Sequence, residues 1–174
     1  MNQSRNRGFT LIELLVVIGI ISILATVLLL QLGTARAKSR DAKRIADINQ
    51  VRSAVELYFD DNGSYPATNA LSALLVPKYL LKLPTDPLTT TCSTTTYDGA
   101  AGAVVDCYGY AYDPAANPTK YQVWADLEQS NRNALASDAD IDTSAWAGGA
   151  KKNGATETCT TGTPSDCIFD LGQN

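Results

Sequence analysis

Four cysteines are the residues of this sequence best suited to covalent chemistry. Cys92, Cys107, Cys159 and Cys167 lie in segments rich in Thr, Gly and Asp and form no Cys-x-x-Cys spacing. Metal and thioredoxin-like sites are therefore disfavoured, and disulfides outside the cytoplasm are favoured. Of the three possible pairings, Cys92 with Cys107 and Cys159 with Cys167 close the shortest loops. We expect that pairing, with buried free thiols as the alternative.

Three aspartates, Asp138, Asp140 and Asp142, alternate in a polar segment and could bind Ca²⁺ through their oxygens. The segment is not an EF-hand, because no glycine stands at its sixth place and Gly149 occupies the place of the bidentate glutamate. A water-solvated acidic loop is the favoured interpretation, and calcium is the alternative. We expect no other cofactor.

The absence of histidine removes the commonest catalytic chemistry. Imidazole acid-base catalysis, Ser-His and Cys-His nucleophiles and imidazole zinc sites all require that residue. The sequence also contains no Gly-x-Ser-x-Gly motif and no credible pair of catalytic carboxylates. We therefore expect no catalytic residue and no enzymatic activity.

Charge divides the sequence into a basic segment and an acidic body. Residues 36–52 hold six Lys/Arg and two Asp, whereas residues 53–174 hold six Lys/Arg and fifteen Asp/Glu. An acidic body repels phosphate backbones, so we expect no direct binding of nucleic acid. Three interpretations of the cations at 36–44 stay open: they bind lipid headgroups, pair with acidic patches of neighbouring subunits, or form a solvated helix face.

Glu13 stands at the start of a long uncharged segment. As a helix, residues 14–35 would reach about 33 Å, enough to cross a hydrocarbon core of about 30 Å. Arg5 and Arg7 precede this segment, which places the body on the far side of the membrane. A carboxylate within a span costs roughly 2.5 to 3.5 kcal/mol, so Glu13 should have a cationic partner; solvation by headgroups is the alternative.

A secretory signal cut near Ala35-Arg36-Ala37 is the competing interpretation of the N-terminus. The apolar run is longer than the apolar region of a usual signal sequence, and Glu13 at its start does not suit one. We therefore favour a retained span.

The elements that must position these residues begin with one long helix. Apolar residues recur at intervals of three and four beyond the span, and no proline interrupts residues 9–61. A single helix would be about 80 Å long. The repeating positions are Ile45, Ile48, Val51, Val55, Tyr58 and Phe59.

Beyond the helix the sequence predicts a small set of strands. A short helix is expected within 70–81 and a turn at 84–87. Alternation predicts half-buried strands at 108–112 and 121–127, joined by a turn at 113–118. A third strand is expected at 167–171. Residues 129–166 remain unassigned. Tyr108, Tyr110, Tyr112 and Trp124 could bind sugars or surfaces, but sheet packing is favoured.

The run Gly8-Phe9-Thr10-Leu11-Ile12-Glu13-Leu14, after its basic leader, resembles the processing signal of type IV pilins and type II secretion pseudopilins. The resemblance extends through the long helix, residues 63–66 and 83–87, and the strand pair. It implies an α+β pilin fold, with one long N-terminal helix packed on a small antiparallel sheet. The expected parts are a leader (1–8), a transmembrane helix (9–35), its amphipathic continuation (36–61) and an extracytoplasmic head (62–174).

The resemblance also implies a function as a structural filament subunit. Prepilin peptidase would cut after Gly8 and methylate the new amine of Phe9, and that amine would neutralise Glu13 of a neighbouring subunit. Further partners would be copies of the chain, minor pilins, an assembly ATPase, a platform protein and the inner membrane. The family's major pseudopilin holds calcium in a loop after its strands, but the glycine-rich ligand segment expected after Leu127 is absent.

Two alternatives to a pilus subunit remain. The first is a major pseudopilin of type II secretion, which residues 83–87 favour, whereas the cysteines and the unmatched tail favour a pilus. The second is a singly anchored binding module.

Overall fold

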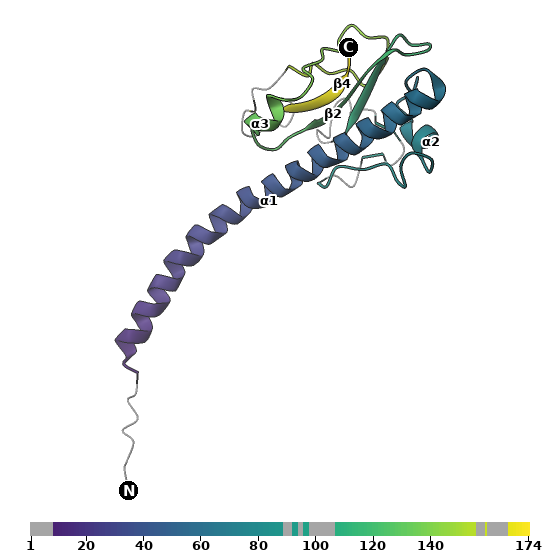
Figure 1. Ribbon diagram of the computed structural model, residues 1–174. Coiled ribbons are helices and arrows are strands. Elements are labelled where there is room, and N and C mark those ends of the chain that lie inside the picture. Colours follow the sequence, from purple (N-terminus) through teal and green to yellow (C-terminus); the bar gives the residue numbers. More distant parts are fainter. Residues whose placement is uncertain (1–8, 89–91, 94–95, 98–106, 156–158, 160–166) are drawn as a thin grey trace. The chain divides into compact units, whose positions relative to one another are not determined.

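The computed structural model describes residues 9–88, 92–93, 96–97, 107–155, 159 and 167–174 (Figure 1). Two compact units, Met1–Ala37 and Lys38–Asn174, divide the chain. The second unit is called the head below. The predicted long helix is present as α1, Leu11–Asn62, and contributes residues to both units.

The part of α1 in the first unit presents apolar side chains on all sides. Large apolar residues from Leu11 to Leu32 are exposed, and Phe9 just before the helix is 85% exposed. A helix that is apolar all round needs a non-aqueous neighbour. In the part of the chain that the structure describes, α1 is the one helix long and apolar enough to cross a membrane.

The part of α1 in the head carries the predicted amphipathic pattern. Ile48, Val51 and Val55 are fully buried and belong to the main core. The helix ends at Gly63, whose φ of 71° is a left-handed conformation that glycine adopts without strain. The Gly63 amide donates to the Phe59 carbonyl at 2.7 Å, which closes the last turn as a left-handed cap.

A four-stranded antiparallel sheet packs on this part of α1, in the order β3-β1-β2-β4. Figure 1 shows β2 and β4 beside the C-terminal half of the helix. The strands are β1 (Gly109–Asp113), β2 (Lys120–Asp126), β3 (Gly148–Gly149) and β4 (Ile168–Gln173). The α+β fold is confirmed, and β1, β2 and β4 match the three predicted strands within about two residues.

Two short elements lie in the segment that the sequence left unassigned. They are β3 and helix α3, Arg132–Leu135. The predicted helix at 70–81 is shorter than expected, because α2 covers only Leu71–Leu75. Val76 is extended (φ −103°, ψ 134°) and precedes Pro77, a residue that disfavours helical backbone in the position before it.

The prediction that β2 is half buried was wrong. Gln122, Trp124 and Asp126, expected on a solvated face, are all buried. Their side of the sheet is covered by the loop between α3 (Arg132–Leu135) and β3, where Ile141 and Trp146 form a second cluster with Ala111. The sheet therefore has a core on both faces, which explains why Tyr108, Tyr110 and Trp124 pack inside the head.

Candidate functional site

The N-terminal docking segment, Phe9 to Glu13, begins α1. Gly8 lies outside the described residues. Glu13 Oε2 accepts hydrogen bonds from the Thr10 amide at 2.9 Å and from Thr10 Oγ1 at 2.8 Å. The Glu13 amide in turn lies 3.3 Å from Thr10 Oγ1, to which it donates. This reciprocal pattern is a capping box, in which the side chains satisfy amides that the first helical turn leaves unpaired.

The capping box was missed at the sequence level, although Thr10-x-x-Glu13 before an apolar run is its signature. It gives Glu13 a role within its own helix, in addition to the cationic partner expected for a carboxylate in a membrane span. Its donors are a neutral amide and a neutral hydroxyl, which supply no positive charge to pair with the carboxylate. A cation is still needed where this segment enters a membrane.

A buried ionic cluster at the base of the head joins α1 to the sheet. The side chain of Arg44 is 0% exposed and contacts three carboxylates. Its Nη1 lies 2.8 Å from Asp41 Oδ1 and 2.6 Å from Glu128 Oε1, and its Nε and Nη2 donate to both oxygens of Asp86. Arg40 adds a two-point contact with Glu128.

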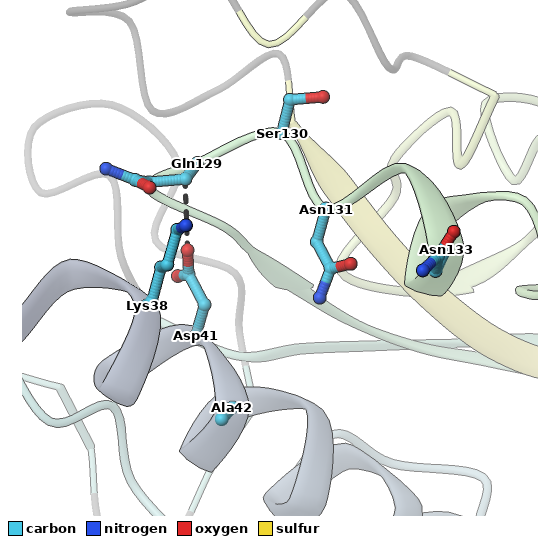
Figure 2. Close-up of a pocket in the computed structure, with 7 residues that line it drawn as sticks. All are labelled: Lys38, Asp41, Ala42, Gln129, Ser130, Asn131 and Asn133. Carbon is cyan, nitrogen blue, oxygen red and sulfur yellow. Dashed lines mark hydrogen bonds between the residues drawn. The ribbon is translucent and has the colours of Figure 1, made fainter. Parts of the chain in front are cut away.

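Asp41 also binds the backbone at the end of the β2 segment. Its carboxylate accepts the amides of Glu128 at 2.9 Å and Gln129 at 3.0 Å. Figure 2 shows Asp41 on α1 facing the Gln129 backbone. Together with the Arg44 contacts, these bonds join the segment after β2 to the part of α1 within the head. They are charge-assisted hydrogen bonds, which are roughly twice as strong as neutral ones.

The electrostatics of the cluster follow from burial and pairing. Burial alone would lower the pKa of Arg44, but the hydrogen bonds to Asp86, Glu128 and Asp41 raise it above its ordinary value. The hydrogen bond from Arg40, opposed by burial and reinforced by Arg44, lowers the pKa of Glu128. Arg44 and Glu128 therefore favour their charged forms near neutral pH.

None of the three interpretations of the basic segment describes Arg40 and Arg44, which pair with acidic residues of their own chain. A sequence signal was present, because Arg44 precedes Ile48 by four residues and Val51 by seven and so lies on the buried face. Arg36 and Lys38 are exposed, and the open interpretations still apply to them.

A polar pocket of about 360 Å³ lies beside the ionic cluster (Figure 2). Its lining consists of amide, hydroxyl and charged side chains with one alanine. This composition provides hydrogen-bonding groups and no recognisable catalytic pair. The lining residues are Lys38, Asp41, Ala42, Gln129, Ser130, Asn131 and Asn133.

Both disulfides follow the shortest-loop pairing. Cys92 is bonded to Cys107 and Cys159 to Cys167, with Cα–Cα distances of 5.4 and 4.4 Å. The described residues contain no free cysteine. Cys167 directly precedes β4, so the second bridge holds the chain where the edge strand begins.

The three candidate calcium ligands make separate contacts. Asp138 Oδ2 accepts the amide of Asp170 at 3.3 Å, and Asp142 Oδ1 accepts that of Ser144 at 3.0 Å. Asp140 contributes its backbone amide to Asp170 Oδ1. In the described ranges no group of three or more His, Cys, Asp or Glu residues meets the spacing of a metal site. Calcium binding stays a prediction.

Replacing Glu128 by glutamine should destabilise the head in a pH-dependent way. A carboxylate with a lowered pKa contributes stability that is present above its ordinary value of 4.5 and is lost as the pH falls through its folded value. We expect a loss of about 1 to 3 kcal/mol at neutral pH, since the bonds are charge-assisted. The difference in unfolding free energy between Glu128→Gln and the parent should shrink as the pH falls well below 4.5.

Urea unfolding of the full chain in detergent, at neutral pH and at about pH 3, measures this difference. Asp60→Asn is the matched control, because Asp60 is exposed and forms no ion pair among the residues described. An equal difference at both pH values would contradict the charged role of Glu128.

Known proteins match the N-terminal motif of this chain and, over a longer stretch, about half of its length. A family profile described as "Prokaryotic N-terminal methylation motif" matches residues 3–29. The "Type II secretion system core protein G" of Klebsiella michiganensis is 37% identical over 101 residues, covering 50% of this chain and 71% of that protein. Its namesake from Pectobacterium carotovorum is 35% identical over 97 residues, covering 48% of this chain and 62% of its own length.

A pilus protein is also similar. The "Type IV wide pilus major component PilA4" of Thermus thermophilus is 47% identical over 64 residues, which cover 37% of this chain and 49% of that protein. No solved structure matches the chain. The methylation motif, the long helix on a small antiparallel sheet and these similarities agree. The chain belongs to the family of type IV pilins and type II secretion pseudopilins.

Proposed function

We propose that this chain is a structural subunit of a type IV pilus or pilus-like filament and has no enzymatic activity. The observation that carries the proposal is the methylation motif at residues 3–29, which includes the start of α1. Residues 11–35 of this helix are apolar apart from a few polar side chains and contain one carboxylate, Glu13. The precursor would sit in the inner membrane with its head outside the cytoplasm. Subunits would then leave the membrane and stack helix against helix.

The apolar part of α1 needs a non-aqueous environment both before and after assembly. Its exposed apolar residues need either lipid or the helices of other subunits around them. Cleavage after Gly8 creates a cationic amine at Phe9, four residues before Glu13, and a neighbouring subunit's amine would neutralise that carboxylate. This ion pair would fix the axial position of each new subunit's helix relative to the helix of its neighbour.

The ionic cluster of Arg44, Asp41, Asp86 and Glu128 suits a filament subunit. Any force applied to the sheet and loops of the head is transmitted to α1 through the contacts of these parts with the helix. Charge-assisted bonds at several points resist separation better than a single apolar contact would. The cluster would therefore hold the sheet and loops of the head on residues 38–62 of α1.

The second candidate is a major pseudopilin of a type II secretion system, with a short periplasmic filament. The names of the Klebsiella and Pectobacterium relatives favour it, while the Thermus relative favours a pilus. Deleting the gene in its host distinguishes them: loss of surface filaments supports the pilus, and retention of exported enzymes in the periplasm supports secretion. In both cases the partners would be prepilin peptidase, an assembly ATPase, a platform protein and minor pilins.

Processing is the direct test of the assignment. The mature protein is expected to begin at Phe9 with a methylated amine, because the bond after Gly8 stands at the step from polar to apolar sequence. Mass analysis of the N-terminal peptide measures this. Gly8→Val should accumulate uncut precursor, since a side chain at that place blocks close approach of a protease. Ser4→Val is the control and should be cut normally.

A mature start at Lys38 would instead indicate a secretory signal. An unprocessed chain that keeps Met1 in the presence of active prepilin peptidase would favour the singly anchored binding module.

A further inference from the structure

The polar pocket of Figure 2 lies between α1 and residues 129–133, the segment that follows β2. Lys38, Asp41 and Ala42 form its wall on α1. Asp41 is 3% exposed, and its two oxygens already accept hydrogen bonds from Arg44 and from two backbone amides. Lys38 is exposed and is therefore, among the described lining residues, the charged side chain that a ligand can reach.

The second wall of the pocket supplies neutral hydrogen-bond donors. Figure 2 shows Asn131 directed toward α1, while Lys38 extends from the helix toward the segment that carries Asn131. Asn131 Oδ1 accepts a backbone amide at 3.4 Å, which leaves its Nδ2 group as a donor for a ligand. The side chains of Gln129, Ser130 and Asn133 form no hydrogen bond within the described part of the chain. One cation beside neutral donors suits a phosphate diester, which carries a single negative charge.

Lys38 also lies at the depth of lipid headgroups. It follows residue 35, the end of the expected membrane span, by three residues of α1, which is about 5 Å of helical rise. The headgroup layer on each side of the hydrocarbon core is about 5 to 8 Å thick. Lys38 therefore reaches the layer in which lipid phosphates lie.

The charge of Lys38 is unusual for its side of the membrane. Lys and Arg are biased toward the cytoplasmic ends of spans, whereas this end is expected outside the cytoplasm. Arg40 and Arg44, which follow on the same helix, pair with carboxylates of their own chain. Lys38 forms no ion pair with any residue that the structure describes, so an external anion would account for its charge.

We propose that this pocket binds the phosphate of a phospholipid headgroup while the subunit is in the membrane. Lys38 pairs with the phosphate, and the Asn131 amide group donates a hydrogen bond to it from the opposite wall. The inference goes beyond filament assembly, because it concerns the subunit before it leaves the bilayer. It requires only that α1 is inserted in the membrane. The contact holds residues 129–133 at the membrane surface, and extraction of a subunit breaks it.

Photolabelling from the lipid side tests this contact in the full chain without altering the pocket. The chain is inserted into vesicles of phosphatidylethanolamine and phosphatidylglycerol that contain a trace of an anionic phospholipid with a diazirine on its headgroup. After illumination, peptide mapping should find label on both walls, at 38–42 and at 129–133. Ser144 and Ala145 are exposed but lie outside the pocket, and they should stay unlabelled.

Substitution of the lysine measures its share of the binding. Lys38→Gln should lower the labelling of 129–133 about fivefold, the factor expected for one lysine at an anionic membrane surface. Lys38→Arg keeps the cation and should be labelled as the parent is. Lys151→Gln makes the same change at an exposed lysine outside the pocket and should have no effect. A urea midpoint equal to that of the parent shows that Lys38→Gln leaves the fold intact.

A competing anion separates a lipid from a soluble phosphate. Inorganic phosphate, compared with chloride at equal ionic strength, should leave the labelling unchanged, because headgroups at the surface have a much higher effective concentration. Loss of labelling in phosphate alone would overturn the lipid assignment in favour of a soluble anion.

Label at 38–42 alone would also overturn the inference, and so would equal labelling of 129–133 in the parent and in Lys38→Gln. Either result would leave Lys38 as a solvated cation at the membrane surface. These outcomes do not depend on whether the chain builds filaments, so the inference and the proposed function can fail separately.

Discussion

Replacing Arg44 by methionine is expected to lower the free energy of unfolding of the head by about 3 to 5 kcal/mol. The substitution keeps most of the side-chain volume but removes the cation that three carboxylates share. Asp86 and Asp41 would then remain buried, with side chains 1% and 4% exposed, and Glu128 would keep only Arg40. A buried charge without its partner costs several kcal/mol, a large fraction of the stability of a small domain.

Urea unfolding of the full chain in detergent measures the loss, followed by a spectroscopic signal from the head. Arg36→Met is the matched control: it makes the same change on the same helix at an exposed position, so the effect should stay within about 0.5 kcal/mol. A loss below about 1 kcal/mol for Arg44→Met would mean that apolar packing, and not the ionic cluster, holds the head on α1.

Replacing Glu13 by glutamine is expected to lower incorporation into filaments about thirtyfold or more, while membrane insertion and cleavage continue. Losing one partner of a buried charge pair costs 2 to 5 kcal/mol, and 1.4 kcal/mol is a factor of ten. Glutamine also suits a capping box, so the bonds to Thr10 can persist when the charge is gone. The variant therefore separates the intersubunit ion pair from local capping.

Filament yield and the fraction of cleaved subunit, measured in the same cells, decide between these roles. Removing the carboxylate lowers the cost of inserting the helix by roughly 2.5 to 3.5 kcal/mol, so poor membrane insertion cannot explain a defect. Leu14→Ile is the control for a neutral change in the same turn. Normal filaments from Glu13→Gln would show that the charge is dispensable. A defect in Glu13→Ala together with normal Glu13→Gln would assign the residue to capping.

The features that the sequence alone determined are those with a local signature. The processing motif and α1 depend on residue order over one continuous segment, and β1 and β2 show alternation within five to seven residues. The disulfide pairing followed from the shortest loops, with separations of 15 and 8 residues. The capping box at Thr10 and Glu13 was equally local, so it could have been predicted.

The tertiary structure decided what depends on distant partners. Helical spacing places Arg44 on the buried face of α1, but only the return of Asp86 and Glu128, 42 and 84 residues later, makes the burial of its charge tolerable. Gln122 and Trp124 likewise alternate as if exposed, until the loop with Ile141 and Trp146 covers their face of the sheet. Burial of a polar side chain depends on which segments fold back over it, and periodicity along one strand or helix carries no information about those segments.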